Sequence, residues 1–275
     1  KTEKGFETII VNWLVDQNGY EQGTNDDYNK EYAVDETRLF RFLNDTQPRE
    51  MAKLGVNNSD QKKRQFLNRL SGEIAKRGII DVLRNGVKAY PADLIMFYFT
   101  PTENNEKSKQ MFEKNIFSVT RQLRYSIDAS KLALDLCLFI NGLPVITIEL
   151  KNHFTGQTTA DAVEQYKEDR DPRDTLFSFK RCMVHFAVDD QTIMFCTKLA
   201  GKDSWFLPFN KGYNDGTGNP PNPDGIMTDY LWKDILTKWK LSRIIENYAQ
   251  VVVDEDPDTK KKTVKQIWPR YHQLD

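Results

Sequence analysis

Asp135, Glu149 and Lys151 are the ionisable residues of one otherwise largely apolar stretch, residues 132–152. The stretch is typical of two strands joined at Asn141-Gly142, and a buried strand seldom holds a charge without a partner or a metal. Two carboxylates suit a hard divalent cation such as Mg²⁺, and that cation suits phosphodiester hydrolysis. The sequence therefore predicts Asp135, Glu149 and Lys151 as catalytic residues, with the two carboxylates as metal ligands.

The turn between these strands must meet a geometric condition. Side chains alternate faces along a strand, so Glu149 and Lys151 share a face. A two-residue turn with regular pairing would place Asp135 opposite Ile148 and direct Glu149 to the other face. The chemistry therefore requires an odd loop or a β-bulge that brings Asp135 opposite Thr147 or Glu149.

A structural alternative exists for the same residues. Asp135 could end its strand, and Glu149 and Lys151 could be solvated charges on an edge strand. A Glu-Leu-Lys triplet alone is weak evidence, because it often occurs by chance. The longer arrangement, an aspartate in an apolar strand followed by a turn, a second apolar strand and Glu-x-Lys, favours the catalytic interpretation.

The longer arrangement resembles the motif of the PD-(D/E)xK nuclease superfamily. Thirteen residues separate Asp135 from Glu149-Leu150-Lys151, and Leu134 stands where the motif has proline. The resemblance implies an α/β fold with a central mixed β-sheet flanked by helices. It also implies the backbone carbonyl of Leu150 as a third metal ligand.

Further sequence stretches across residues 115–232 narrow the resemblance from the superfamily to one family within it. They are RQLRYS (121–126), LFINGLPVITIELKN (138–152), AVEQYKEDR (162–170), FKRCMVHFAVD (179–189), TKLAGKDSWFLPFNKG (197–212) and GTGNP (216–220). In this order they look like the N-terminal endonuclease region of the R (motor/restriction) subunit of type I restriction-modification enzymes. The opening residues FETIIVNWLVDQNGY (6–20) also resemble the first helix of that family.

This second resemblance implies a type I site-specific deoxyribonuclease that uses Mg²⁺ to cleave duplex DNA after motor-driven translocation. Methyltransferase and specificity subunits would be its partners. The endonuclease domain would span residues 1–250, and a hairpin and connector over 251–275 would lead into a motor (helicase) domain outside this sequence. ATP would act only through that motor, since no Walker A sequence occurs here. Two alternatives stay open: a catalytically silent DNA clamp or methyltransferase-docking module, and a free-standing nuclease.

The resemblance also suggests residues around the catalytic three. Glu7 matches a position sometimes placed near the metal, although a surface glutamate on a helix is the alternative. Gln165 and Tyr166 lie on the helix where some of these nucleases carry a Q-x-x-x-Y pattern that engages DNA. Here the tyrosine follows the glutamine directly, which weakens its match. The remaining DNA-contact candidates, each of which could equally be a surface salt-bridge partner, are Arg121, Arg124, Lys180 and Arg181.

Charge is distributed unevenly along the chain. The 275 residues carry a net charge of −1, which argues against indiscriminate coating of DNA. Residues 49–88, however, hold ten Lys/Arg and four Asp/Glu. They include a segment, residues 61–78, that predicts a helix with an apolar stripe of Phe66, Leu67, Leu70 and Ile74. Its basic face is either solvated or in contact with phosphates.

Composition indicates an ordinary globular protein, with 39% hydrophobic and 29% charged residues. No apolar run is long enough to cross a membrane and no secretory signal opens the chain, so we expect a cytoplasmic protein without a membrane partner. The resemblance to type I restriction enzymes implies that the cell is prokaryotic. The three histidines are too scattered to suggest a zinc site, and His185 is expected in or near the core. Three cysteines without CxxC spacing are expected to be reduced core thiols: Cys137, Cys182 and Cys196.

The apolar periodicity and the turn residues predict the remaining elements. Helices are expected over 6–15, over 36–77 with breaks near 48 and 57–59, and over 160–170 and 230–246. Strands are expected over 93–99, 115–125, 181–188, 192–197 and 205–208, with a hairpin over 251–267. Residues 21–35 and 212–225 are expected to be loops.

Overall fold

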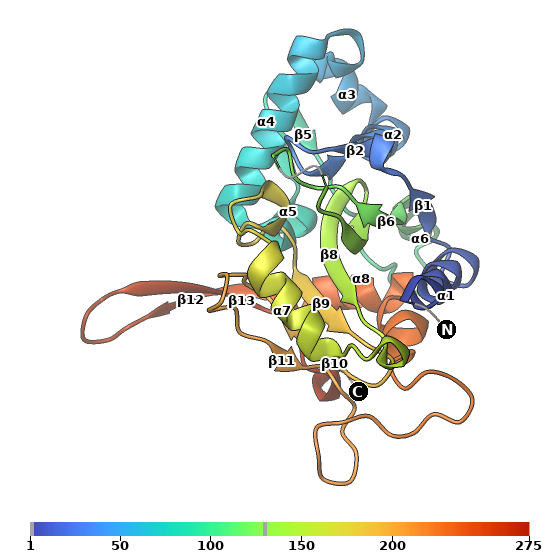
Figure 1. Cartoon of the computed structure of the whole chain (residues 1–275). Coiled ribbons are helices and arrows are strands. Elements are labelled where there is room, and N and C mark those ends of the chain that lie inside the picture. Colours follow the sequence, from blue (N-terminus) through green and yellow to red (C-terminus); the bar gives the residue numbers. More distant parts are fainter. Residues whose placement is uncertain (1–2, 129–130, 275) are drawn as a thin grey trace.

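A seven-stranded mixed β-sheet forms the centre of the chain (Figure 1), in a computed structural model that describes residues 3–128 and 131–274. The strands pair antiparallel except for two parallel contacts, β1 with β6 and β8 with β9. In spatial order they are β1 (Glu21–Gly23), β6 (Phe117–Leu123), β7 (Leu134–Ile140), β8 (Leu143–Leu150), β9 (Val184–Val188), β10 (Ile193–Cys196) and β11 (Leu207–Pro208). The expected α/β class with a mixed central sheet is confirmed, and the arrangement is consistent with a nuclease-like fold.

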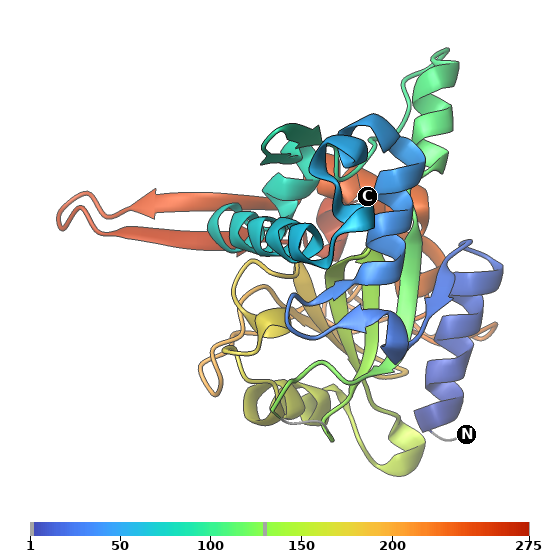
Figure 2. The ribbon, with the colours of Figure 1, turned by 90° about the horizontal axis from the view of Figure 1, so that it is seen from above.

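Helices flank this sheet, as the two views in Figures 1 and 2 show. They are α1 (Glu3–Asp16), α2 (Glu36–Thr46), α3 (Pro48–Leu54), α4 (Asp60–Arg77), α5 (Ile79–Asn85), α6 (Glu106–Glu113), α7 (Thr159–Asp169) and α8 (Lys238–Asn247). Helix α7 packs against β8, β9 and β10, whereas α1 packs against β1, β6 and β8. Side-chain alternation along β7 and β8 therefore decides which residues meet α7.

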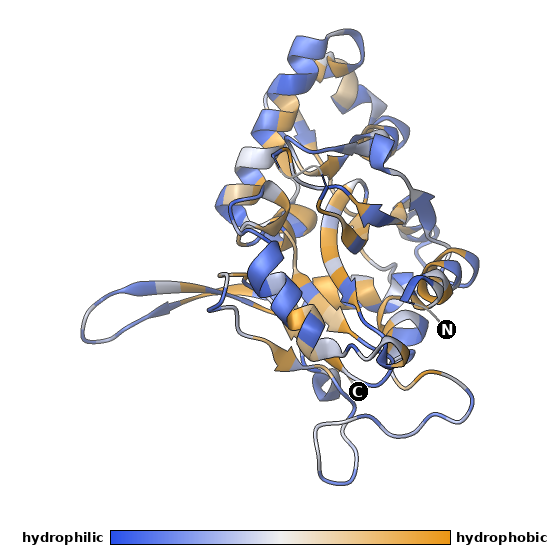
Figure 3. Ribbon diagram, viewed as in Figure 1, coloured by the Kyte–Doolittle hydropathy of each residue, from blue (hydrophilic) through white to orange (hydrophobic). Residues whose placement is uncertain are grey.

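Two apolar clusters fill the layers. The smaller one joins Ala162 and Tyr166 of α7 to Cys137 and Phe139 of β7, and the larger one holds the opposite faces of β7 and β8 with most of the other helices. Hydrophobic residues gather in the central strands in Figure 3, whereas outer helix faces and the hairpin tip are hydrophilic. The three cysteines are buried and unpaired, as expected for core thiols.

The basic helix forms as its pattern predicts. Ser59 caps the N-terminus of α4 by accepting a hydrogen bond from the Lys62 N–H, and the helix ends before Gly78, whose φ is 86°. The predicted apolar stripe, which is Phe66, Leu67, Leu70 and Ile74, is buried. Its charged side chains consequently face outward.

The expected strand over residues 93–99 is wrong. Only Ala92–Leu94 forms a strand, β5, which pairs with β4 (Val87–Ala89). The side-chain amides of Gln47 and Asn115 each bind both an N–H and a carbonyl within residues 95–98. Because side chains satisfy these backbone groups, the apolar run needs no strand partner.

The expected loop over residues 21–35 is also wrong. It contains β1 at the edge of the central sheet and a short pair formed by β2 (Tyr28–Asn29) and β3 (Val34–Asp35). Arg38 holds this region together, since its guanidinium contacts both Glu21 and Asp35. These contacts join side chains that are separated in the sequence, and the alternation of residues along a strand does not predict them.

Towards the end of the chain, the predicted helix over 230–246 is interrupted. A π-helical turn at Leu231–Ile235 precedes α8, and the Thr237 side chain caps α8 by accepting from the Lys240 N–H. The expected hairpin is confirmed as β12 (Gln250–Glu255) and β13 (Lys262–Ile267), which project from the body (Figure 2). Residues 212–225 are irregular, as expected. Over residues 3–128 and 131–274, no helix has the length and apolar character needed to span a bilayer.

Candidate active site

The β7–β8 turn is a tight two-residue connection. Asn141 and Gly142 both have positive φ, 51° and 79°, as a type I′ hairpin turn requires. A Cβ on Gly142 would lie 2.4 Å from the Asp35 carbonyl oxygen, so only glycine fits here. Without a correction further along, this turn would leave the two carboxylates on opposite faces.

A β-bulge supplies that correction. The β7–β8 register shifts between Leu138 and Phe139, after which Leu136 pairs with Ile148. Continuing this register by one residue places Asp135 opposite Glu149, on the sheet face that α7 covers. The bulge that the catalytic interpretation required is therefore present, and it brings the two carboxylates side by side.

Glu149 lies in the interior of the protein, where the exposed fraction of the residue is 0%. Its Oε1 accepts a hydrogen bond from Arg170 Nε at 2.5 Å. Its Oε2 is also buried and has no hydrogen-bond partner within residues 3–128 and 131–274. Burial, followed by the charge of Asp135, raises the pKa of Glu149 to about 8, while Arg170 acts in the opposite direction. A buried carboxylate oxygen without a donor is an available position for a cation.

Arg170 fixes the orientation of this carboxylate. It directly follows α7 and is buried, and its two terminal nitrogens donate to the Tyr125 hydroxyl at 3.1 Å and the Ala133 carbonyl at 2.8 Å. All three arms of the guanidinium are thus engaged, which leaves Glu149 little freedom to rotate. The sequence interpretation assigned Arg170 no role. No local pattern marks it, because the contact joins the end of α7 to a distant strand.

Asp135 is held by two donors from opposite sides. Its Oδ2 accepts from the Leu150 N–H at 2.8 Å, and its Oδ1 accepts from Gln122 Nε2 at 3.2 Å. Gln122 is exposed and has φ of 51°, an uncommon value for a residue other than glycine. Sequence reasoning missed Gln122, and no local pattern marks it. Gln122 therefore lies between Asp135 and solvent.

Glu7 on α1 joins the same network. It is 5% exposed, which excludes the surface-glutamate alternative. One of its oxygens accepts from Arg121 Nε at 2.5 Å and the other from Gln122 Nε2 at 2.6 Å. Gln122 therefore links Glu7 to Asp135.

Lys151 follows β8 directly and shares the edge of the site with α1. Its backbone N–H donates to the Val188 carbonyl at 2.9 Å, which continues the β8–β9 pairing. The side chain is largely buried, and its Nζ lies 3.6 Å from Glu3 Oε1 on α1. The structure therefore places Asp135, Glu149 and Lys151 at one end of the adjacent strands β7 and β8, as the sequence predicted.

Two of the predicted DNA contacts have side chains that lie in the core. Tyr166 is fully buried, and its hydroxyl hydrogen bonds with the Thr147 hydroxyl and donates to the Phe186 carbonyl. Arg181 is also buried, and it donates to backbone carbonyls, including that of Ala33 at 3.1 Å. Neither group is presented to a ligand.

The side chains of the other four candidates differ in the contacts that they make within the protein and in their exposure. Arg121 is ion-paired with Glu7, and Lys180 Nζ donates to the Lys76 carbonyl at the end of α4. Arg124 is exposed just beyond β6. Gln165 is partly buried, and its Oε1 has no partner in the part of the chain that the structure describes. Arg124 is therefore the exposed residue of the four, whereas the Gln165 amide oxygen is buried.

A second group of potential metal ligands lies nearby. Ligand atoms of His153, Asp189 and Asp190 fall within 4.8 Å of one another. His153 Nδ1 hydrogen bonds with Asp190 at 2.6 Å, and the Asp189 oxygens already accept from several backbone N–H groups, including that of Thr159. These internal bonds account for the group without a metal. His185, by contrast, is the expected core histidine, and burial lowers its pKa to about 3.

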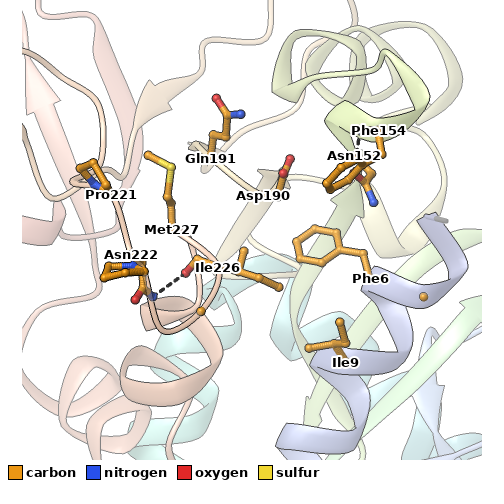
Figure 4. A pocket seen from close by; sticks show the side chains of 13 residues that line it. Phe6, Ile9, Asn152, Phe154, Asp190, Gln191, Pro221, Asn222, Ile226 and Met227 are labelled. Carbon is orange, nitrogen blue, oxygen red and sulfur yellow. Dashed lines mark hydrogen bonds between the residues drawn. The ribbon is translucent and has the colours of Figure 1, made fainter. Parts of the chain in front are cut away.

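An apolar cavity of about 630 Å³ adjoins the site, and Figure 4 shows its lining. Phe6 and Ile9 of α1 form one wall, and Ile226 and Met227 form the opposite one. Asn152, the neighbour of Lys151, also contributes. Among the residues that the structure describes, no lysine or arginine lines the cavity, so this lining does not suit a phosphate.

The mixed sheet flanked by helices defines an α/β protein and is consistent with a nuclease-like fold. Comparison with known proteins specifies the family: the model for the type I restriction enzyme R protein N terminus matches residues 1–204. The chain therefore belongs to that family. It is also similar to the putative type I restriction enzyme MjaVIIIP endonuclease subunit of Methanocaldococcus jannaschii, with 24% identity over 221 residues. That alignment covers 75% of this chain and 19% of the relative, so the chain spans about a fifth of the relative's length.

Proposed function

We propose that this chain is the Mg²⁺-dependent endonuclease domain of a type I restriction enzyme R subunit, and that it cleaves phosphodiester bonds of duplex DNA. The observation that carries the proposal is the buried, unpartnered Oε2 of Glu149 beside Asp135. Carboxylate oxygens are the ligands that Mg²⁺ prefers. Family membership supports the same reaction class.

The donor set fits a hard cation. Asp135, Glu149 and the backbone carbonyl of Leu150 would hold Mg²⁺, with Glu7 as a further acidic group linked through Gln122. When bound, the ion would polarise the scissile phosphate and lower the pKa of a bound water. The protein's part is to keep the carboxylates aligned, which Arg170 and the Leu150 N–H do.

Lys151 is the cation of this site that would act on the substrate. A lysine beside two carboxylates can stabilise negative charge on the phosphate or hold the proton of the attacking water. Glu3 is its partner at 3.6 Å, which is too long for a strong hydrogen bond. The ammonium therefore remains available to a phosphate.

The wider reaction would depend on the rest of the enzyme. A motor domain would use ATP to bring duplex DNA to this site, and methyltransferase and specificity subunits would complete the complex in the prokaryotic cytoplasm. Arg124 and Gln165 are proposed DNA contacts near the site. A catalytically silent clamp would have no use for Lys151 beside paired carboxylates, which favours an active nuclease.

The test uses the assembled enzyme with motor and partner subunits. Asp135→Ala, Glu149→Ala and Lys151→Ala should each abolish cleavage, while ATP hydrolysis stays near the wild-type rate because it belongs to another domain. Lys261→Ala, on the exposed β12–β13 turn, is the matched lysine control and should cleave normally. Cleavage by Lys151→Ala at the wild-type rate would show that the assignment is wrong.

A further inference from the structure

A second charged region lies between α3, α4 and the β4–β5 hairpin, where a groove of about 800 Å³ opens to solvent. We call it the basic groove. Four basic side chains line it, Lys53, Lys62, Arg69 and Lys88, against one acidic residue, Asp93. In both Figure 1 and Figure 2, α3 and α4 lie apart from α1 and α7, the helices that flank the candidate active site.

The basic groove is built by elements that the core holds in place. Lys62, Gln65 and Arg69 lie on the outer side of α4, away from its buried apolar stripe. Arg69 Nε donates to the Lys88 carbonyl at 3.0 Å, which ties the hairpin to the helix. The separation between the two walls is therefore fixed, and the groove is more than a run of loose surface charges.

Two of its four cations have no internal counterion. Lys53 pairs with Glu50 at 2.5 Å and Arg69 pairs with Glu73 at 3.2 Å. Lys62 and Lys88, however, form no ion pair with any residue in the ranges 3–128 and 131–274. Their positive charge is therefore available to an anionic ligand.

Tyr90 adds an aromatic surface to the same groove. It sits at the turn between β4 and β5 and is 98% exposed. A side chain this exposed contributes almost nothing to the core. Beside Lys88, its ring offers a stacking surface next to cationic groups, which is the combination that binds single-stranded nucleic acid.

We propose that the basic groove binds an unpaired stretch of a DNA strand. Lys62, Lys88 and Arg69 contact its phosphates, and Tyr90 stacks on a base. A paired base in a duplex does not expose its face to a side chain, so the aromatic group favours the unpaired strand over the duplex. The inference does not depend on metal or cleavage, because it concerns residues outside the candidate active site.

The test measures binding by fluorescence anisotropy with EDTA present, so that no cleavage occurs. The probes are a labelled oligodeoxythymidylate of about 12 nucleotides, the length of an ordinary single-strand site, and a duplex of the same length. Lys62→Glu should weaken binding of the single strand at least about tenfold and reduce the salt dependence by about 0.7 per lost phosphate contact. Lys261→Glu makes the same charge change on the distant hairpin and should have little effect.

Tyr90→Ala should weaken single-strand binding about tenfold, a typical loss of one base-stacking contact. Tyr90→Phe should retain it, and Tyr213→Ala, at another exposed tyrosine, should not change it. Equal affinities for Lys62→Glu and Lys261→Glu would overturn the proposal. So would duplex binding that depends on Lys62 but not on Tyr90, because that result would assign the groove to duplex phosphates. A substitution in the candidate active site that abolishes cleavage in the assembled enzyme should leave this single-strand binding unchanged, so failure of the proposed cleavage function and failure of the groove proposal can be told apart.

Discussion

The candidate active site and the basic groove carry charge in opposite ways. Glu149 and Arg170 are buried and paired with each other, whereas Lys62 and Lys88 are exposed and form no ion pair within residues 3–128 and 131–274. The first arrangement holds groups in a fixed geometry for chemistry, and its carboxylates would repel a phosphate unless a cation intervened. The second attracts phosphates but offers no reactive group. Under the two proposals, DNA affinity and catalysis would lie in separate regions of the molecule.

Arg170→Met should have the largest effect on the buried side of this comparison. Removing one partner of a buried ion pair typically lowers the free energy of unfolding by about 3 kcal/mol. Mn²⁺ affinity should also fall by about tenfold or more, because Glu149 would lose the contact that keeps it aligned and that opposes the rise of its pKa. Calorimetric titration with Mn²⁺ and thermal unfolding measure the two effects.

Arg173→Met is the matched control for this substitution, since Arg173 is exposed and pairs with Asp171 at the surface. It should change neither measurement appreciably. Single-strand binding to the basic groove should be the same in both variants. If Arg170→Met binds Mn²⁺ as the wild type does, Arg170 is a structural residue and does not position Glu149.

Acidification should lower the free energy of unfolding, because His185 is buried in its neutral form. Burial lowers the pKa of this histidine to about 3, below the ordinary value of 6.5. Between these two pH values the unfolded chain therefore binds more protons than the folded chain. The contribution of neutral His185 to the free energy of unfolding is complete above pH 6.5 and is lost as the pH falls towards 3. At pH 5 the loss should be about 2 kcal/mol.

His185→Gln should flatten this pH dependence of the free energy of unfolding, measured in urea at several pH values. The comparison between variants is needed because His153 acts in the opposite sense. Its hydrogen bond to Asp190 raises its pKa and so adds stability at low pH. Equal pH slopes for wild type and His185→Gln would contradict the burial of a neutral histidine at this position.

Tyr166→Phe should have the smallest effect, and it separates a structural role from a role in DNA binding. The variant loses hydroxyl hydrogen bonds to Thr147 and to the Phe186 carbonyl, which should lower stability by about 1 kcal/mol. DNA affinity should not change, in contrast to Tyr90→Ala. A loss of DNA affinity without a loss of stability would restore the original expectation for Tyr166.

Local sequence patterns predicted the parts of the molecule that depend on local geometry. Strand alternation required a bulge before the structure showed one, and the helical spacing of Phe66, Leu67, Leu70 and Ile74 gave the buried face of α4 correctly. Both follow from fixed periods along a strand or a helix. The apolar surroundings of the cysteines likewise predicted that they lie in the core.

The remaining parts depend on contacts between distant segments. Arg170 reaches Glu149 across the layer between α7 and the sheet, and Gln122 bridges α1 and β7 from an uncommon backbone conformation. The same holds for residues 95–98, where side-chain amides replace a strand partner. No period along the chain encodes such contacts, and for this reason Tyr166 was expected at the DNA surface although it lies in the core.

The central claim is that Asp135 and Glu149 together form a site for a divalent cation. Calorimetric titration of Mn²⁺ into the wild type and into Glu149→Gln at pH 8 tests it most directly, because Glu149 has a pKa of about 8 and must lose its proton to bind metal. The account predicts one Mn²⁺ bound by the wild type, weaker binding as pH falls, and at least about tenfold weaker binding by Glu149→Gln. Equal Mn²⁺ affinity in both proteins would contradict it.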